Sequence, residues 1–162
     1  MQVHYVSVAM EDVHGRAGIT PQHGFSSIVY ACRPQSRGHV GLYDAKVDSP
    51  PALYPNYFSV EQDLIDTRNG FRETRRVFLQ KAFDEYRGAQ LKPPQDINID
   101  DDDELDAWIR QTGETLYHPV GTCKMGQDEM AVVDAQGSVH GLLGLRVCLL
   151  YTSPSPRDYG TS

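Results

Sequence analysis

The chain has 162 residues, a length typical of one domain with its own hydrophobic core. No apolar stretch is long enough to span a bilayer, and no basic segment followed by an apolar one marks a secretory signal. Three cysteines, Cys32, Cys123 and Cys148, provide neither a disulfide framework nor a four-ligand zinc site. We therefore expect a soluble protein of the reducing cytoplasm that holds no metal.

The formal net charge of -7 comes from one acidic segment. Its members are Asp96, Asp100, Asp101, Asp102, Asp103, Glu104 and Asp106. The rest of the chain is nearly neutral and has no basic stripe for nucleic acid or anionic lipid. Apolar residues follow the acids at Leu105, Trp108 and Ile109, and carboxylates stabilise the first turn of a helix. The pattern favours a helix start over a metal or partner site.

The first part of the chain is rich in strand-forming residues. β-Branched and aromatic side chains predict strands at Val3–Val8 and Phe25–Tyr30, and a shorter one within Ser36–Tyr43. Pro50 and Pro51 are expected to break regular structure after them.

Two helices are predicted in the middle of the chain. Ser59 and Gln62 form a capping-box pattern that starts the first helix, and Gly88 ends it. Its apolar stripe is a predicted core surface made of Leu64, Phe71, Val77, Phe78, Ala82 and Tyr86. A second helix is predicted from about Asp102 to the neighbourhood of Thr115, because Pro119 cannot continue it.

Short strands are predicted around 132–133 and 145–147, after a turn-rich loop. Strands, then helices, then strands, without a βαβ alternation, indicate an α+β fold in which helices flank an antiparallel sheet. The sequence contains no Gly-x-Gly-x-x-Gly that follows a strand, so it has no dinucleotide-binding fingerprint.

The composition changes abruptly after Val147. The run Cys148-Leu-Leu-Tyr-Thr-Ser-Pro-Ser-Pro-Arg-Asp158 looks like the conceptual translation of a transposase-type sequencing-library adaptor. We therefore predict one domain over residues 1–147 and treat residues 148–162 as an artefact tail. A disordered Ser/Pro tail is the alternative.

Residue types alone leave the chemistry open among six histidines. His118 has a favourable position, because it precedes Pro119 at a helix end and enters a glycine-bracketed loop of the kind that often carries catalytic groups. Cys123 could form a thiol nucleophile with it, but no orienting third group or oxyanion signature accompanies the pair. A small buried side chain is the simpler interpretation of Cys123. His140 fits a structural turn, and the nine tyrosines fit packing better than an aromatic box.

Three later segments carry a family resemblance. They are Tyr117-His-Pro-Val-Gly-Thr-Cys-Lys-Met-Gly126, Asp128-Glu-Met-Ala-Val-Val-Asp134 and Val139-His-Gly-Leu142. Earlier matches are His23-Gly-Phe25, Ser36-Arg-Gly-His-Val40, Pro55-Asn-Tyr57 and Tyr86-Arg-Gly88. Over residues 1–147 the chain resembles the C-terminal region of glucose–methanol–choline (GMC) oxidoreductases, and its choline-oxidising branch more than the sugar or aryl-alcohol oxidases.

The resemblance implies a substrate-binding domain that covers the reactive face of FAD. In this family the histidine of the His-Pro-x-Gly-Thr motif takes the proton from a substrate hydroxyl, and that role maps onto His118. The implied substrate is a small primary alcohol such as choline, whose hydride passes to the flavin. The implied partner is the missing N-terminal FAD-binding domain of the same polypeptide.

The chain departs from the family pattern in three ways. The glycine-rich FAD-binding part is missing, Cys148 replaces the expected Val-Asp-Ala-Ser-type segment after Leu-Arg-Val, and the Gly-Asn segment near the family's C-terminus is absent. We therefore expect the chain alone to be inactive, and its sequence singles out no FAD-binding or substrate-binding residue. Alternatives are a binding module that keeps the fold without flavin and, less favoured, a Cys123-dependent thiol hydrolase.

Overall fold

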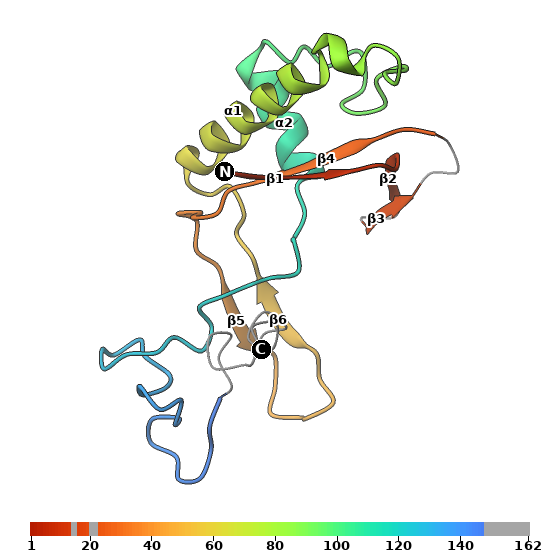
Figure 1. Ribbon diagram of the computed structural model, residues 1–162. Coiled ribbons are helices and arrows are strands. Elements are labelled where there is room, and N and C mark those ends of the chain that lie inside the picture. Colours follow the sequence, from red (N-terminus) through yellow and green to blue (C-terminus); the bar gives the residue numbers. More distant parts are fainter. Residues whose placement is uncertain (14–15, 20–22, 148–162) are drawn as a thin grey trace, which may run out of the picture. The chain divides into compact units, whose positions relative to one another are not determined.

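A computed structural model describes residues 1–13, 16–19 and 23–147. The described residues fall into two compact units, Met1–Glu114 and a second one that begins at Thr115 (Figure 1). The predicted artefact tail, residues 148–162, lies outside the described residues.

Antiparallel strands and helices make up the first unit, which confirms the predicted α+β class. Within the described ranges the strands pair as three two-stranded antiparallel sheets. β1 (Gln2–Val6) pairs with β4 (Ser26–Tyr30), β2 (Met10–Val13) with β3 (Arg16–Ile19), and β5 (His39–Leu42) with β6 (Pro51–Tyr54). The expected break at Pro50 and Pro51 is wrong for Pro51, which opens β6. A proline is tolerated as the first residue of an edge strand because no ladder N–H is required there.

The first helix is shorter than predicted at both ends. α1 spans Glu61–Phe78, and its N-cap is Val60, without a side-chain cap, rather than Ser59. The Ser36 hydroxyl accepts the Val60 N–H at 3.1 Å, so a loop distant in sequence satisfies a backbone N–H at the start of the helix. The chain leaves the helix well before Gly88 because Arg87 donates to the Phe78 carbonyl at 2.7 Å, and a 3₁₀ turn, η1 (Lys81–Phe83), follows.

The second helix confirms the interpretation of the acidic segment. α2 spans Asp102–Thr112, and the Asp101 carboxylate caps it by accepting the backbone N–H groups of Asp103 and Glu104. The segment also faces the arginines of α1. Arg68 lies 3.1 Å from Asp102 and 2.6 Å from Asp106, and Arg72 lies 2.7 Å from Asp102.

The core of the first unit lies on two sides of α1, which is between α2 and the β1–β4 sheet (Figure 1). Leu64, Leu105 and Ile109 are buried between the two helices, and Phe58, Phe71 and Trp108 pack around them. On the sheet side, Phe78 makes edge-on contacts with Tyr5, Phe25 and Phe83, at ring-centroid distances of 5.6, 4.8 and 5.5 Å. The stripe prediction holds for Leu64, Phe71 and Phe78. It is wrong for Ala82 and Tyr86, which are exposed because α1 ends before them at Phe78, and for Val77, which is exposed on the last turn of the helix.

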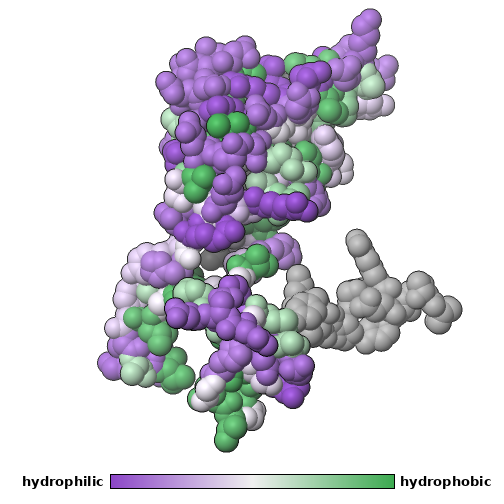
Figure 2. Space-filling model, turned by 90° about the vertical axis from the view of Figure 1, so that its left-hand side faces the viewer, coloured by the Kyte–Doolittle hydropathy of each residue, from purple (hydrophilic) through white to green (hydrophobic). Residues whose placement is uncertain are grey.

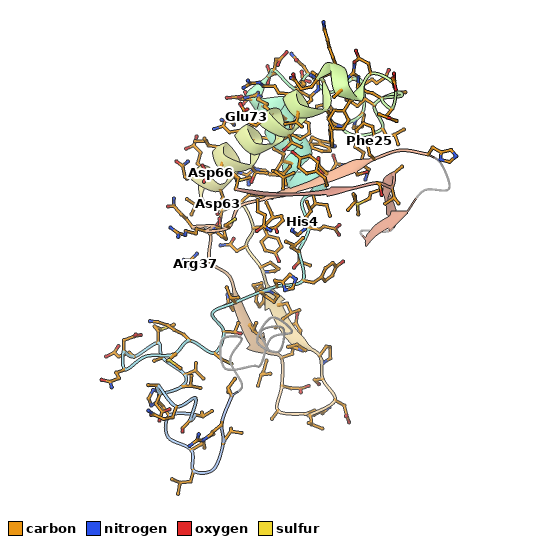
Figure 3. All side chains as sticks on the ribbon, viewed as in Figure 1. His4, Phe25, Arg37, Asp63, Asp66 and Glu73 are labelled. Carbon is orange, nitrogen blue, oxygen red and sulfur yellow. The ribbon has the colours of Figure 1, made fainter. Side chains whose placement is uncertain are left out.

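A buried carboxylate joins the start of α1 to the loop before β5. Asp63 accepts the Gln35 N–H at 2.7 Å and the Ser36 N–H at 2.8 Å (Figure 3). Burial alone would raise the pKa of Asp63. Hydrogen bonds from Gln35 and Ser36 and the Arg37 guanidinium outweigh it and hold the pKa below its usual value.

The surface over the helices is mainly hydrophilic in the upper part of Figure 2. None of the helices in the described ranges is long and apolar enough to cross a membrane.

Replacing Gly70 tests the close packing of α1 on the sheet. An added Cβ would lie 2.9 Å from Val29 Cγ1 and 2.6 Å from the flexible end of Met1. In an open helix Gly→Ala stabilises by about 1 kcal/mol, but the Val29 contact makes Gly70→Ala destabilising by about 1–3 kcal/mol. Urea unfolding of the chain measures this difference. Gly88→Ala, which meets nothing within 4 Å, is the matched control and should change stability by less than about 0.5 kcal/mol.

Replacing Asp63 tests the anchor between α1 and the loop. Asp63→Asn turns one acceptor into a donor that faces an N–H, so we expect a loss of about 2 kcal/mol at pH 7. Because the pKa of Asp63 is depressed in the folded state, its contribution is complete above the unfolded pKa of about 4 and disappears as pH falls through the folded value. The difference in the free energy of unfolding between the parent chain and Asp63→Asn should therefore narrow below about pH 4. Glu73→Gln, at an exposed ion pair with Arg76, is the control. A difference in unfolding free energy that stays constant from pH 7 to pH 2 would contradict a stabilising role for the ionised Asp63 carboxylate.

Candidate functional site

A backbone network in the second unit holds the glycine-bracketed loop. Val133 is fully buried at its centre, and its carbonyl accepts the Gly126 N–H at 3.0 Å. The Lys124 carbonyl accepts the N–H groups of Val132 and Val133 at 2.8 and 3.2 Å. The strands predicted around 132–133 and 145–147 are isolated bridges, Val133 with Val139 and Ser138 with Arg146, because the intervening turns leave no room for longer ladders.

His118 lies outside this network with its imidazole exposed to solvent. Within the described part of the chain, no hydrogen bond, ion pair or ring contact engages its side chain. Both ring nitrogens are therefore available to a group that the chain does not supply.

The residue before His118 has an unusual backbone conformation. Tyr117 has φ 62°, in the left-handed region that non-glycine residues seldom adopt, and its N–H donates to the Thr115 hydroxyl at 3.0 Å. Strained backbone of this kind costs about 1–3 kcal/mol and is frequent at functional sites. Gly121, with φ 99°, makes a second left-handed position after Pro119, and a Cβ there would meet open space. The loop thus holds His118 between two turns and leaves it open.

The other described histidines differ in their surroundings. His140 Nε2 lies 2.9 Å from the Gly126 carbonyl, and the backbone N–H of His140 donates to the Val132 carbonyl. These contacts confirm the structural interpretation of this residue. His39 stacks on Tyr54 at a centroid distance of 4.4 Å. His23, like His118, is exposed and makes no described side-chain contact, whereas His14 lies outside the described residues.

His4 belongs to a polar cluster that sequence reasoning did not single out. Its Nε2 lies 2.8 Å from the Tyr30 hydroxyl and 3.0 Å from the Gln2 amide nitrogen, on the side of β1 away from α1 (Figure 3). Burial, followed by the charge of Cys32, raises the pKa of Tyr30, so its hydroxyl remains a neutral donor. The signal was present in the alternation of β1, since Val3 and Tyr5 face the helix and His4 faces the other way.

Cys123 is half-buried and free, and the described interactions include no contact between it and His118. The structure therefore does not bring this thiol and this imidazole together as a nucleophile–base pair. Among the residues that the structure describes, no three His, Cys, Asp or Glu side chains converge to hold a metal ion.

Two aspartates fix the turns after the loop. Lys124 Nζ lies 2.8 and 2.7 Å from the two carboxylate oxygens of Asp128, and this contact lowers the pKa of Asp128. Asp134 accepts the N–H groups of Ser138 and Gln136 at 2.8 and 2.9 Å, and these bonds, the first above all, lower its pKa. Both carboxylates are engaged in local structure, whereas the exposed imidazole of His118 has no described partner.

Comparison with known proteins identifies the family. A family model described as GMC oxidoreductase, for the C-terminal domain, matches residues 34–150. The chain therefore belongs to the GMC oxidoreductase family, which confirms the resemblance of the Tyr117–Gly126 segment.

Curated relatives include the oxygen-dependent choline dehydrogenases of Escherichia coli O45:K1 and Klebsiella pneumoniae, which are 44% and 45% identical over 147 residues. Each alignment covers 91% of this chain. It covers 25% of the Escherichia coli protein and 26% of the Klebsiella protein, so the chain spans about a quarter of their length.

Solved structures of longer oxidases contain the same fold. Pyridoxine 4-oxidase from Mesorbium loti matches 76% of this chain and 22% of its own, with a TM-score of 0.59 and 25% identity. A formate oxidase variant from Aspergillus oryzae, studied for FAD modification, matches 78% of this chain and 22% of its own, with a TM-score of 0.67 and 28% identity.

Proposed function

We propose that the complete protein is an FAD-dependent oxidoreductase acting on the CH–OH group of a primary alcohol, with choline as the best single substrate and His118 as general base. Membership of the GMC oxidoreductase family supports the reaction class. Similarity to choline dehydrogenases supports the substrate. Among the described residues of the motif, the open imidazole of His118 is the observation that carries the assignment.

The chemistry asked of His118 is proton abstraction from the substrate hydroxyl. A neutral imidazole accepts this proton at the ring nitrogen that carries no hydrogen, Nδ1 or Nε2 according to the tautomer, and no described protein group competes for either one. As the O–H proton leaves, electron density rises on the carbinol carbon, and the C–H bond there becomes a better hydride donor. A carboxylate could serve as base too, but Asp128 and Asp134 are occupied by Lys124 and by backbone N–H groups.

When bound, FAD supplies the acceptor for the hydride. The loop fits a place beside its ring, because His118 is flanked by Tyr117, Val120 and the unobstructed backbone of Gly121, all exposed. The sequence contains no Gly-x-Gly-x-x-Gly fingerprint, so we expect the residues that bind the FAD phosphates in the part of the parent protein beyond this chain. On this proposal the chain alone binds no FAD and is inactive.

A chimera tests the assignment of His118. Residues 1–147 replace the matching segment of Escherichia coli choline dehydrogenase, and stopped-flow absorbance follows flavin bleaching by choline. Loss of a positioned general base slows proton transfer by about 10²–10⁴-fold, and we expect that loss for His118→Ala. His140→Ala controls for the loss of an imidazole from the same unit, and Cys123→Ala tests the thiol alternative.

The controls separate the possible outcomes. The Cys123→Ala chimera should reduce the flavin at the parental rate. The His118→Ala and Cys123→Ala chimeras should both keep the flavin absorbance. An undiminished rate in His118→Ala would exclude it as the base. A well-folded chimera that never retains flavin would favour the binding-module alternative.

A further inference from the structure

The backbone just before His118 is held by one side chain, that of Thr115. The Thr115 hydroxyl oxygen accepts the Tyr117 N–H at 3.0 Å, which closes a turn across Leu116. Among the described residues, no other hydrogen bond is made within the stretch 114–123. The position of the peptide plane between Leu116 and Tyr117 therefore depends on the Thr115 hydroxyl.

This hydrogen bond matters because Tyr117 has a backbone conformation that its residue type disfavours. A φ of 62° places Tyr117 in the left-handed region, where a residue with a Cβ is strained. If its N–H were released, Tyr117 would relax to a negative φ, and this change would turn the Cα–Cβ bond of the next residue, His118. The Thr115 hydroxyl is the described group that opposes this relaxation.

On the other side of His118 the backbone is limited by Pro119. A proline has a fixed φ and disfavours the helical region for the residue before it. Within the unit that begins at Thr115, no described side-chain contact orients the imidazole itself. The direction in which His118 points is therefore set by its backbone, with Thr115 acting before it and Pro119 after it.

We infer that Thr115 is a positioning residue for the proton transfer, because its hydroxyl holds the backbone turn that aims His118. The inference rests on the proposed function of His118 as general base. A general base must lie about 2.6–3.2 Å from the oxygen whose proton it takes, and a displacement of about 1 Å can slow a reaction by about 100-fold. Thr115 need not touch substrate or flavin to change the rate, since it acts through His118.

A double-mutant cycle in the chimera tests the inference. Thr115→Val removes the hydroxyl and keeps the β-branched shape, whereas Thr115→Ser keeps the hydroxyl and is the matched control. With choline at saturation, we expect Thr115→Val to bleach the flavin about 10–100-fold more slowly and Thr115→Ser to stay within about 3-fold of the parental rate. In the His118→Ala background, Thr115→Val should alter the remaining rate by less than about 2-fold, because the group that Thr115 positions is gone.

Two further readouts separate positioning from loss of fold or of substrate binding. The Thr115→Val chimera should retain its flavin absorbance, and its half-saturating choline concentration should change by less than about 3-fold. Thr115→Ala repeats the measurements in case valine disturbs the turn.

The inference would be overturned by a parental rate in Thr115→Val, by equal slowing with and without His118, or by loss of flavin from both Thr115→Val and Thr115→Ala. In the last two cases Thr115 would support the fold and not the aim of the imidazole. A parental rate in His118→Ala would instead overturn the proposed function, and this inference with it. Slow bleaching in His118→Ala with a parental rate in Thr115→Val would overturn the inference alone, so the two failures are distinguishable.

Discussion

The buried carboxylate of Asp63 is the contact through which the first unit is organised. It binds two consecutive backbone N–H groups of the loop after β4 and thereby fixes where the chain turns toward β5. Ser36 completes the junction by accepting the N–H of Val60 at the start of α1. A few residues on, Gly38 lies so close to the end of β6 that an added Cβ would come within 2.1 Å of the Tyr54 carbonyl oxygen. The helix and the loop therefore meet through hydrogen bonds, and the loop meets the hairpin through a close backbone approach, and no apolar pattern specifies either contact.

This junction explains which elements were predictable. The start of α2 follows from local chemistry, because Asp101 caps the helix with its own carboxylate and the acids after it lie in the first turn. The start of α1 does not, since the N-cap is Val60 instead of Ser59, and Ser36, distant in sequence, accepts its N–H. Its end is set by Arg87, which reaches back to the Phe78 carbonyl, rather than by Gly88. β6 was missed because a proline opens it, which strand propensity counts against.

The candidate site shows a similar division. Composition and spacing leave six histidines as alternatives, and only the motif around His118 selects one of them. The structure narrows the choice, since His140, His39 and His4 each have a described hydrogen bond or ring contact, whereas His118 and His23 have none and only His118 lies in the motif. The strained Tyr117 before it could not be foreseen, because tyrosine carries no preference for the left-handed region. The open imidazole lies in a chain that spans about a quarter of its relatives' length.

The central claim is that the imidazole of His118 itself accepts the substrate proton, and chemical rescue tests it most directly. In the chimera, His118→Gly removes the base and leaves a space that free imidazole can enter. The account predicts that added imidazole raises the rate of choline-dependent flavin bleaching in proportion to its neutral form, and that the parental chimera does not respond. A His118→Gly chimera that retains flavin and bleaches at the parental rate without imidazole would contradict the account.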